Sequence, residues 1–216
     1  MNFINGHIYH IYNRGNNRQL IFFTKENCRY FLRKVRSNIL PLADILAFCL
    51  MPNHFHFMVM VKNSSDHCTR EGSHDSRQTK SGQTNHPLVG KVAHLLSSYT
   101  RAINIQENRT GSLFTKKTKS KDITEREPLR RIKGLHPTQS LYALNCFHYI
   151  HQNPLKAGLV DKMEDWEFSS FKDFMGKHSG GIVNHRLAQE IIGFDLDSFQ
   201  EQSYLILKDK DVEGIW

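Results

Sequence analysis

Several signatures of secreted, membrane and nucleotide-driven proteins are missing from this sequence. No apolar run approaches the length of about 18 residues that a membrane helix needs, and no basic-then-apolar leader opens the chain. The four cysteines show no CxxC spacing, which is typical of a reduced setting. There is also no GxxxxGK loop to cradle a nucleotide. We therefore expect a soluble, cytoplasmic protein that contacts no membrane and needs no nucleotide cofactor.

Acidic residues are in short supply as well. The 216 residues include 29 Lys and Arg against 21 Asp and Glu, for a net charge of +8 and a pI near 9.4. This balance favours a polyanionic partner such as nucleic acid. The length suits one sizeable core. We expect one domain over residues 1–176 with a flexible polar insertion at about 63–87, followed by an acidic helical extension over 177–216.

Hydrophobic periodicity predicts an alternation of strands and helices. The expected elements are a strand at 7–12, a helix at 25–38, two strands of a hairpin at 45–51 and 55–61, a helix at 88–105, a basic strand after residue 109, and a helix at 140–153. Pro154 is expected to end the last helix, because the residue before a proline disfavours helical geometry. This order predicts an α+β protein with a ferredoxin-like (RRM-like) antiparallel sheet, helices on one face and a C-terminal helical extension.

His54 and His56 stand two residues apart in a segment with the pattern of a strand. A period of two places both imidazoles on one face, roughly 7 Å apart at their origins, which suits two ligands of one cation. The pattern equally fits a turn histidine followed by a hydrogen-bonded strand histidine. With 13 histidines in the chain, an HxH pair can also arise by chance. Spacing alone leaves both interpretations open.

Tyr149 is the candidate nucleophile. At 100° per residue it falls on the side of the 140–153 helix opposite the apolar stripe formed by Leu144, Phe147 and Ile150. Asn153 lies one turn further along, so its amide oxygen is a candidate third metal ligand. The alternative is that Tyr149 packs against a neighbouring element and Asn153 merely ends the helix before Pro154.

Basic residues gather in the segment between the last two predicted helices. A charge run is usually a solvated face, but this one lies on the predicted strand between the two site-bearing elements, which favours a phosphate track. Two residues of the loop after the first strand are candidates for further contacts near the site. The candidate nucleic-acid ligands are Asn13, Arg14, Arg101, Lys116, Lys117, Lys119 and Lys121.

Six short motifs in a fixed order resemble one known family. They are YNRGNNR at 12–18, MPNHFHFMV at 51–59, SYTRAIN at 98–104, GSLF at 111–114, YIHQNPLKAGLV at 149–160 and WEFSSF at 166–171. Together they are similar to the transposases of the single-tyrosine HUH family, in particular the REP-associated tyrosine transposases and their insertion-sequence relatives. The resemblance spans roughly residues 6–176, apart from the polar insertion.

The resemblance implies a chemistry and its residues. His54 and His56 match the two histidines of the HUH motif, Tyr149 matches the nucleophile, and Asn153 stands where relatives often carry a glutamine ligand. A Mg²⁺ or Mn²⁺ ion and a single-stranded DNA substrate beside a hairpin are implied, with cutting and rejoining through a 5′-phosphotyrosine. In the family the tyrosine helix can serve a partner subunit's histidines, so we also expect a homodimer.

Three other functions compete with this hypothesis. The first is a non-catalytic, RRM-like module that binds single strands or hairpins. The second is a related HUH enzyme, either a replication initiator or a relaxase, although the YNRGNN and NPLKAG elements favour the transposase branch. The third is a metal-dependent hydrolase that acts through water, which would release a free 5′ phosphate and never trap protein on DNA.

Overall fold

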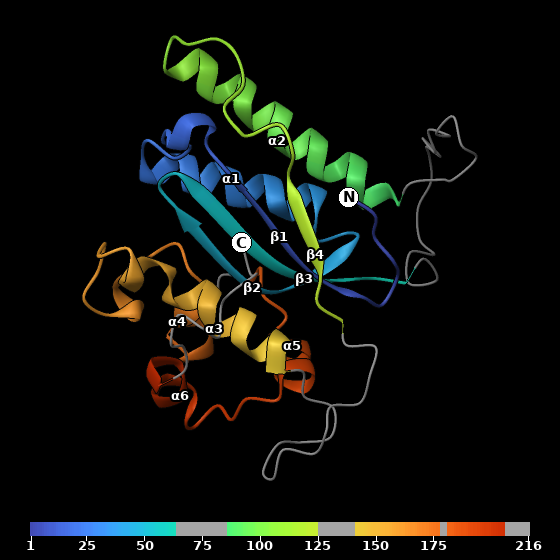
Figure 1. Cartoon of the computed structure of the whole chain (residues 1–216), viewed down its shortest axis with the longest axis vertical. Coiled ribbons are helices and arrows are strands. Elements are labelled where there is room, and N and C mark those ends of the chain that lie inside the picture. Colours follow the sequence, from blue (N-terminus) through green and yellow to red (C-terminus); the bar gives the residue numbers. More distant parts are fainter. Residues whose placement is uncertain (64–85, 125–140, 178–180, 206–216) are drawn as a thin grey trace.

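The computed structural model describes residues 1–63, 86–124, 141–177 and 181–205 (Figure 1). The predicted insertion at 63–87 falls almost wholly outside these ranges, as does the end of the acidic extension. In chain order the elements are β1 (Ile8–Arg14), η1 (Asn16–Arg18), α1 (Lys25–Asn38), β2 (Ala43–Met51), β3 (His54–Val61), α2 (Pro87–Gln106), β4 (Lys119–Asp122), α3 (Leu141–Lys156), η3 (Met163–Asp165), α4 (Phe171–Phe174), α5 (His185–Ile192) and α6 (Phe199–Leu205).

The strands form one four-stranded sheet in the order β2-β3-β1-β4, and every pair in it is antiparallel. The hairpin of β2 and β3 follows the predicted turn, while β1 inserts between β3 and the short edge strand β4. Two strand-helix-strand crossings produce this order, which is the split arrangement of a ferredoxin-like fold. The predicted α+β class and antiparallel sheet are confirmed.

Helices α1 and α2 cover one face of the sheet (Figure 1). Phe31 of α1 is fully buried, and its ring lies 5.3 Å from that of Phe55 and 4.9 Å from that of Tyr99 on α2. The Tyr99 hydroxyl donates a 2.7 Å hydrogen bond to the carbonyl of Ile21, so this aromatic core leaves the hydroxyl paired. Thr24 and Asn27 begin α1 with a reciprocal capping box.

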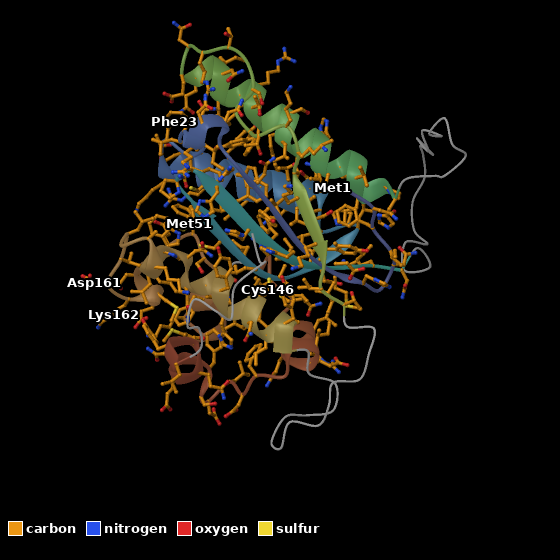
Figure 2. The ribbon with its side chains drawn as sticks, in the orientation of Figure 1. Met1, Phe23, Met51, Cys146, Asp161 and Lys162 are labelled. Carbon is orange, nitrogen blue, oxygen red and sulfur yellow. The ribbon has the colours of Figure 1, made fainter. Side chains whose placement is uncertain are left out.

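Helix α3 lies against the opposite face of the sheet, on β2 and β3 (Figure 1). The prediction that helices cover only one face therefore holds for α1 and α2 alone. The physical reason is visible in β2, where Cys49 and Leu50 point to opposite faces and are both fully buried. A strand that is apolar on both sides needs a layer on both sides. Figure 2 places Cys146 of α3 where this helix approaches the sheet.

Helix α3 does not end at Pro154, as the sequence predicted, but continues to Lys156 with the proline inside it. The ring removes one backbone donor in the last turn only, where few helical hydrogen bonds remain to be lost. The helix then closes at Gly158, whose φ of 66° is left-handed. The amide of Ala157 still donates to the carbonyl of Asn153, so Asn153 stays within regular helix.

The back of α3 carries an aromatic cluster shared with the C-terminal helices. The ring of Phe147 stacks on Phe194 at 4.9 Å and contacts Phe174 and Phe199. The helical extension predicted after residue 176 thus contains α5 and α6, and both contact α3. The division into domains at that point stays a prediction. No helix within the described ranges is long and apolar enough to span a membrane.

His148 in this cluster makes folding sensitive to acid. Burial lowers the pKa of the His148 imidazole from 6.5 to about 4. Nδ1 of the ring lies 3.0 Å from the hydroxyl oxygen of Ser203. The unfolded chain binds the proton more readily, so the stability that His148 contributes is complete above pH 6.5 and is lost as the pH falls towards 4. Between these limits we expect wild type to lose about 3 kcal/mol more unfolding free energy than His148→Gln. Urea unfolding at a series of pH values measures this, with exposed His94→Gln as the control; parallel curves for wild type and His148→Gln would contradict it.

Candidate metal and tyrosine site

Strand β3 presents its two histidines to the α3 side of the sheet. Alternation along the strand turns Phe55 and Phe57 towards α1, where their rings lie near Phe31. His54 and His56 therefore share the opposite face, and their ring centroids are 5.0 Å apart at an interplanar angle of 86°. The predicted placement of both imidazoles on one face is confirmed by this geometry, and the apolar side of β3 anchors the strand behind them.

The first histidine has one ring nitrogen committed to a neighbour. Nδ1 of His54 lies 2.6 Å from Oδ1 of Asn53. Burial is the main cause that lowers the pKa of His54, so the ring is neutral and carries one N–H. Amide oxygens only accept, and the Asn53 oxygen is much the nearer of the two that face this ring, so we assign the proton to Nδ1, which leaves a lone pair on Nε2 of His54.

That lone pair meets another acceptor. Nε2 of His54 lies 3.5 Å from Oδ1 of Asn153 on α3, while Nδ2 of Asn153 donates at 2.8 Å to the carbonyl of Tyr149 and so fixes the amide orientation. Two acceptors that face each other across this distance are the arrangement expected of ligands around one cation. The residues present thus fit a divalent ion held by His54, Asn153 and the adjacent His56, although the described residues hold no cluster of three His, Cys, Asp or Glu side chains suited to a metal.

The second histidine is fully buried. Burial, with the nearby His10 and His54 adding to it, holds the pKa of His56 well below its ordinary value. The neutral imidazole that results is the form that binds metals. Nδ1 of His56 lies 2.9 Å from Nε2 of His10 on the neighbouring strand, so an ion bound by His56 would occupy Nε2.

Tyr149 reaches the same place from α3. Its ring lies edge-on to that of His56, with centroids 5.7 Å apart, and its phenol interacts with the Asn153 side chain. Tyr149 is only 4% exposed, and burial raises the pKa of its phenol above the ordinary value. Without a cation the phenol therefore stays protonated at neutral pH. Both faces of α3 are buried, and the side bearing Tyr149 faces the sheet rather than solvent.

The YNRGNNR motif contains the end of β1 and the turn after it, and this turn supports the site. The Gly15 amide donates to the carbonyl of Asn53 at 2.8 Å, which ties the end of β1 to the residue that orients His54. A Cβ at Gly15 would collide with the carbonyl of Gln19, so only glycine fits there. Asn17 and Arg18 complete the turn with positive φ angles of 51° and 59°.

The predicted nucleic-acid ligands divide between two places. Arg14 pairs with His54 across β1 and β3 and is exposed beside the site. Lys119 and Lys121 of β4 pair with Tyr12 and His10 of β1, and so belong to the face of the sheet that carries His54 and His56. The ammonium of Lys121 lies 4.5 Å above the centre of the Tyr142 ring.

The other predicted basic ligands lie elsewhere. Lys116 and Lys117 line a groove of about 1080 Å³ together with Ser97 and Thr100 of α2, and Lys119 also borders this groove. Arg101 is exposed on α2, the helix that covers the opposite face of the sheet. The structure therefore does not bring these residues to the histidines.

The side chain of Asn13 is held by hydrogen bonds inside the protein. It is buried, its amide nitrogen donates to the hydroxyl of Thr118 at 2.9 Å, and its oxygen accepts from the Thr115 hydroxyl at 2.6 Å. Asn13 therefore fixes the segment that carries Lys116 and Lys117.

Sequence reasoning missed His10 and Asn53, which contact the two histidines directly. A usable signal was present for His10, because the period of two in HIYHIYNR places His10, Tyr12 and Arg14 on one face of β1. No such pattern marks Asn53, which lies in the turn between β2 and β3.

Comparison with known proteins supports the fold. No protein-family model and no curated protein matches the chain. Among solved structures, the chain is similar to that of a REP-associated tyrosine transposase bound to a REP hairpin, with a TM-score of 0.51 and 15% identity over 86% of this chain and 87% of that one. At this identity the likeness shows the fold alone: a four-stranded open antiparallel sheet with helices, over most of the length of both chains.

Proposed function

We propose that this chain is a metal-dependent enzyme that nicks and rejoins single-stranded DNA beside hairpins, in the manner of the REP-associated tyrosine transposases. The observation that carries the proposal is the convergence of His54 Nε2 and Asn153 Oδ1, 3.5 Å apart, next to the Tyr149 phenol. The fold shared with a transposase bound to a hairpin supports it. So does the basic character of the chain, with its net charge of +8.

Each residue has a defined role in the proposal. His54, His56 and Asn153 would hold a Mg²⁺ or Mn²⁺ ion, which would polarise a phosphate oxygen and favour the phenolate when bound. Tyr149 attacks the phosphorus, and the bond from phosphorus to the 3′ oxygen breaks. The phenolic proton passes to solvent and the leaving 3′ oxygen takes up a proton. One phosphate ester replaces another, so a DNA hydroxyl can reverse the reaction. Arg14, exposed beside His54, contacts a flanking phosphate.

A labelling experiment tests the proposal and its polarity. The protein is incubated with Mn²⁺ or Mg²⁺ and hairpin oligonucleotides with single-stranded flanks, labelled at either the 5′ or the 3′ end. The products are separated on a denaturing gel. A 5′-phosphotyrosine retains the downstream fragment, so the adduct should carry the 3′ label and lack the 5′ label. Cleaved DNA without an adduct would indicate a hydrolase that acts through water.

A non-catalytic hairpin-binding module is the second candidate. The burial of Tyr149, at 4% exposure, favours it, because a nucleophile must reach its phosphate. In this case the protein would shift hairpins in a native gel with the same affinity in metal or chelator, and no adduct would form across a broad hairpin library.

The proposed chemistry needs no second subunit. Tyr149 and His56 of one chain already lie in ring contact, and Asn153 approaches His54 within that chain. The expected homodimer remains a prediction about assembly, and the mass in solution by light scattering tests it. A mass of one chain would overturn the dimer and leave the site intact.

The lysines of the groove are expected to set DNA affinity rather than chemistry. Replacing Lys116 and Lys117 with alanine should lower the slope of log affinity against log salt by about 1.4, since each phosphate contact to a single strand contributes about 0.7. Fluorescence anisotropy at several salt concentrations measures this slope. The matched control is Lys162→Ala with Lys177→Ala, two exposed lysines that do not line this groove. Equal slopes for both double variants would contradict the prediction.

A further inference from the structure

A third histidine contacts one of the two candidate histidine ligands. His10 of β1 and His56 of β3 are both fully buried, and Nε2 of His10 lies 2.9 Å from Nδ1 of His56. Their rings stack with centroids 5.1 Å apart, and Tyr12 stacks on both of them. The contact is therefore held by the strand register and by a third aromatic ring, within the interior of the protein.

The short contact between two neutral imidazoles holds one proton. If His56 carries it on Nδ1, His10 accepts and Nε2 of His56 keeps a lone pair. If His10 carries it on Nε2, the neutral His56 has its own proton on Nε2 and cannot bind a cation there. The direction of this single hydrogen bond thus decides whether His56 can act as a ligand.

We infer that His10 is a positioning residue that accepts the Nδ1 proton of His56 and thereby presents Nε2 of His56 to the metal ion. The inference rests on the proposed function, because it assigns a role at the same metal site. It adds the orienting partner that metal-binding histidines ordinarily have on their second nitrogen. His54 has such a partner in Asn53, and His10 supplies the equivalent for His56.

Packing alone does not account for an imidazole at position 10. Nδ1 of His10 is buried and has no hydrogen-bond partner among the described residues. An apolar ring of similar size would fill the space without burying an unpaired polar atom. The imidazole of His10 costs stability through this unpaired nitrogen, and the hydrogen bond of its other nitrogen to His56 explains why it is there.

Mn²⁺ binding to the full chain tests this role without DNA or turnover. The dissociation constant is measured from the electron paramagnetic resonance signal of free Mn²⁺ for wild type, His10→Phe, His10→Gln, Tyr12→Phe and His56→Ala. We expect His10→Phe to raise it 10- to 100-fold, whereas His10→Gln, whose amide oxygen still accepts, should restore most of the affinity. Tyr12→Phe keeps the stacked ring and should leave it unchanged.

A second measurement tests the inference even if His10→Phe fails to fold. Long-range ¹H–¹⁵N NMR of the wild-type chain with Mg²⁺ should show His56 protonated on Nδ1, and protonation on Nε2 would overturn the inference. If the Mn²⁺ affinity falls in His56→Ala but stays at the wild-type value in a folded His10→Phe, the role of His10 alone is overturned. Failure of wild type to bind Mn²⁺ more tightly than His56→Ala would overturn the metal site as well.

Discussion

Tyr149→Phe is expected to abolish the covalent protein–DNA adduct while leaving hairpin binding intact. The phenyl ring keeps the edge contact with His56, so the change removes only the atom that attacks phosphorus. Loss of a nucleophile lowers the rate of such reactions by at least about 10⁴-fold. The measurement is the rate of adduct formation on a denaturing gel with Mn²⁺, beside binding by fluorescence anisotropy on the same hairpin.

The matched control for this variant is Tyr142→Phe on the same helix. Tyr142 is partly buried and lies beneath the Lys121 ammonium, so its phenol lies near the site without a role as nucleophile. Adduct formation should persist in Tyr142→Phe. An adduct of undiminished yield in Tyr149→Phe would assign the nucleophile elsewhere and sink the phosphotyrosine proposal for this residue.

His54→Ala is expected to reduce the rate of adduct formation by at least about 100-fold at a fixed Mn²⁺ concentration, because electrostatic stabilisation by the ion is a large part of such catalysis. His54 is only partly buried, so its loss should disturb folding less than the loss of fully buried His56. The rate is measured with Mn²⁺ over a range of concentrations, and excess chelator should bring wild type down to the level of the variant.

Exposed His94 on α2 provides the control for the histidine change. His94→Ala should retain the wild-type rate and the wild-type response to chelator. If the wild-type protein formed adducts equally well in chelator, the proposed metal requirement would be refuted, even if His54→Ala were slow.

The sequence predicted the parts of the fold that depend on periodicity. Helix α1 runs from Lys25 to Asn38 as expected, and the β2–β3 hairpin lies within two residues of its predicted strands. The same periodicity placed His54 and His56 on one face. The proximity of Asn153 to His54 required more than spacing, because it depends on how α3 packs across the sheet. The family resemblance supplied that pairing.

Other features depend on tertiary contacts that one sequence does not reveal. Asn13 looks like a polar loop residue, yet the strand register buries it, and Thr115 and Thr118 use its amide. The layer over the second face of the sheet is a similar case, since an amphipathic pattern does not say which side of a sheet a helix will cover. The rule that a helix ends before a proline considers only neighbouring residues, so it did not predict that α3 continues past Pro154 to Lys156. Packing of the helix decides its length here.

The aromatic cluster behind α3 limits how the chain can be divided. Phe147 on the helix that carries Tyr149 stacks on Phe194, and Gln152 donates to the carbonyl of Ser203 at 2.6 Å. A fragment cut at residue 176 would leave these groups facing water and remove the rear support of the tyrosine helix. The smallest portion worth excising or grafting as a working unit therefore runs through α6, to residue 205.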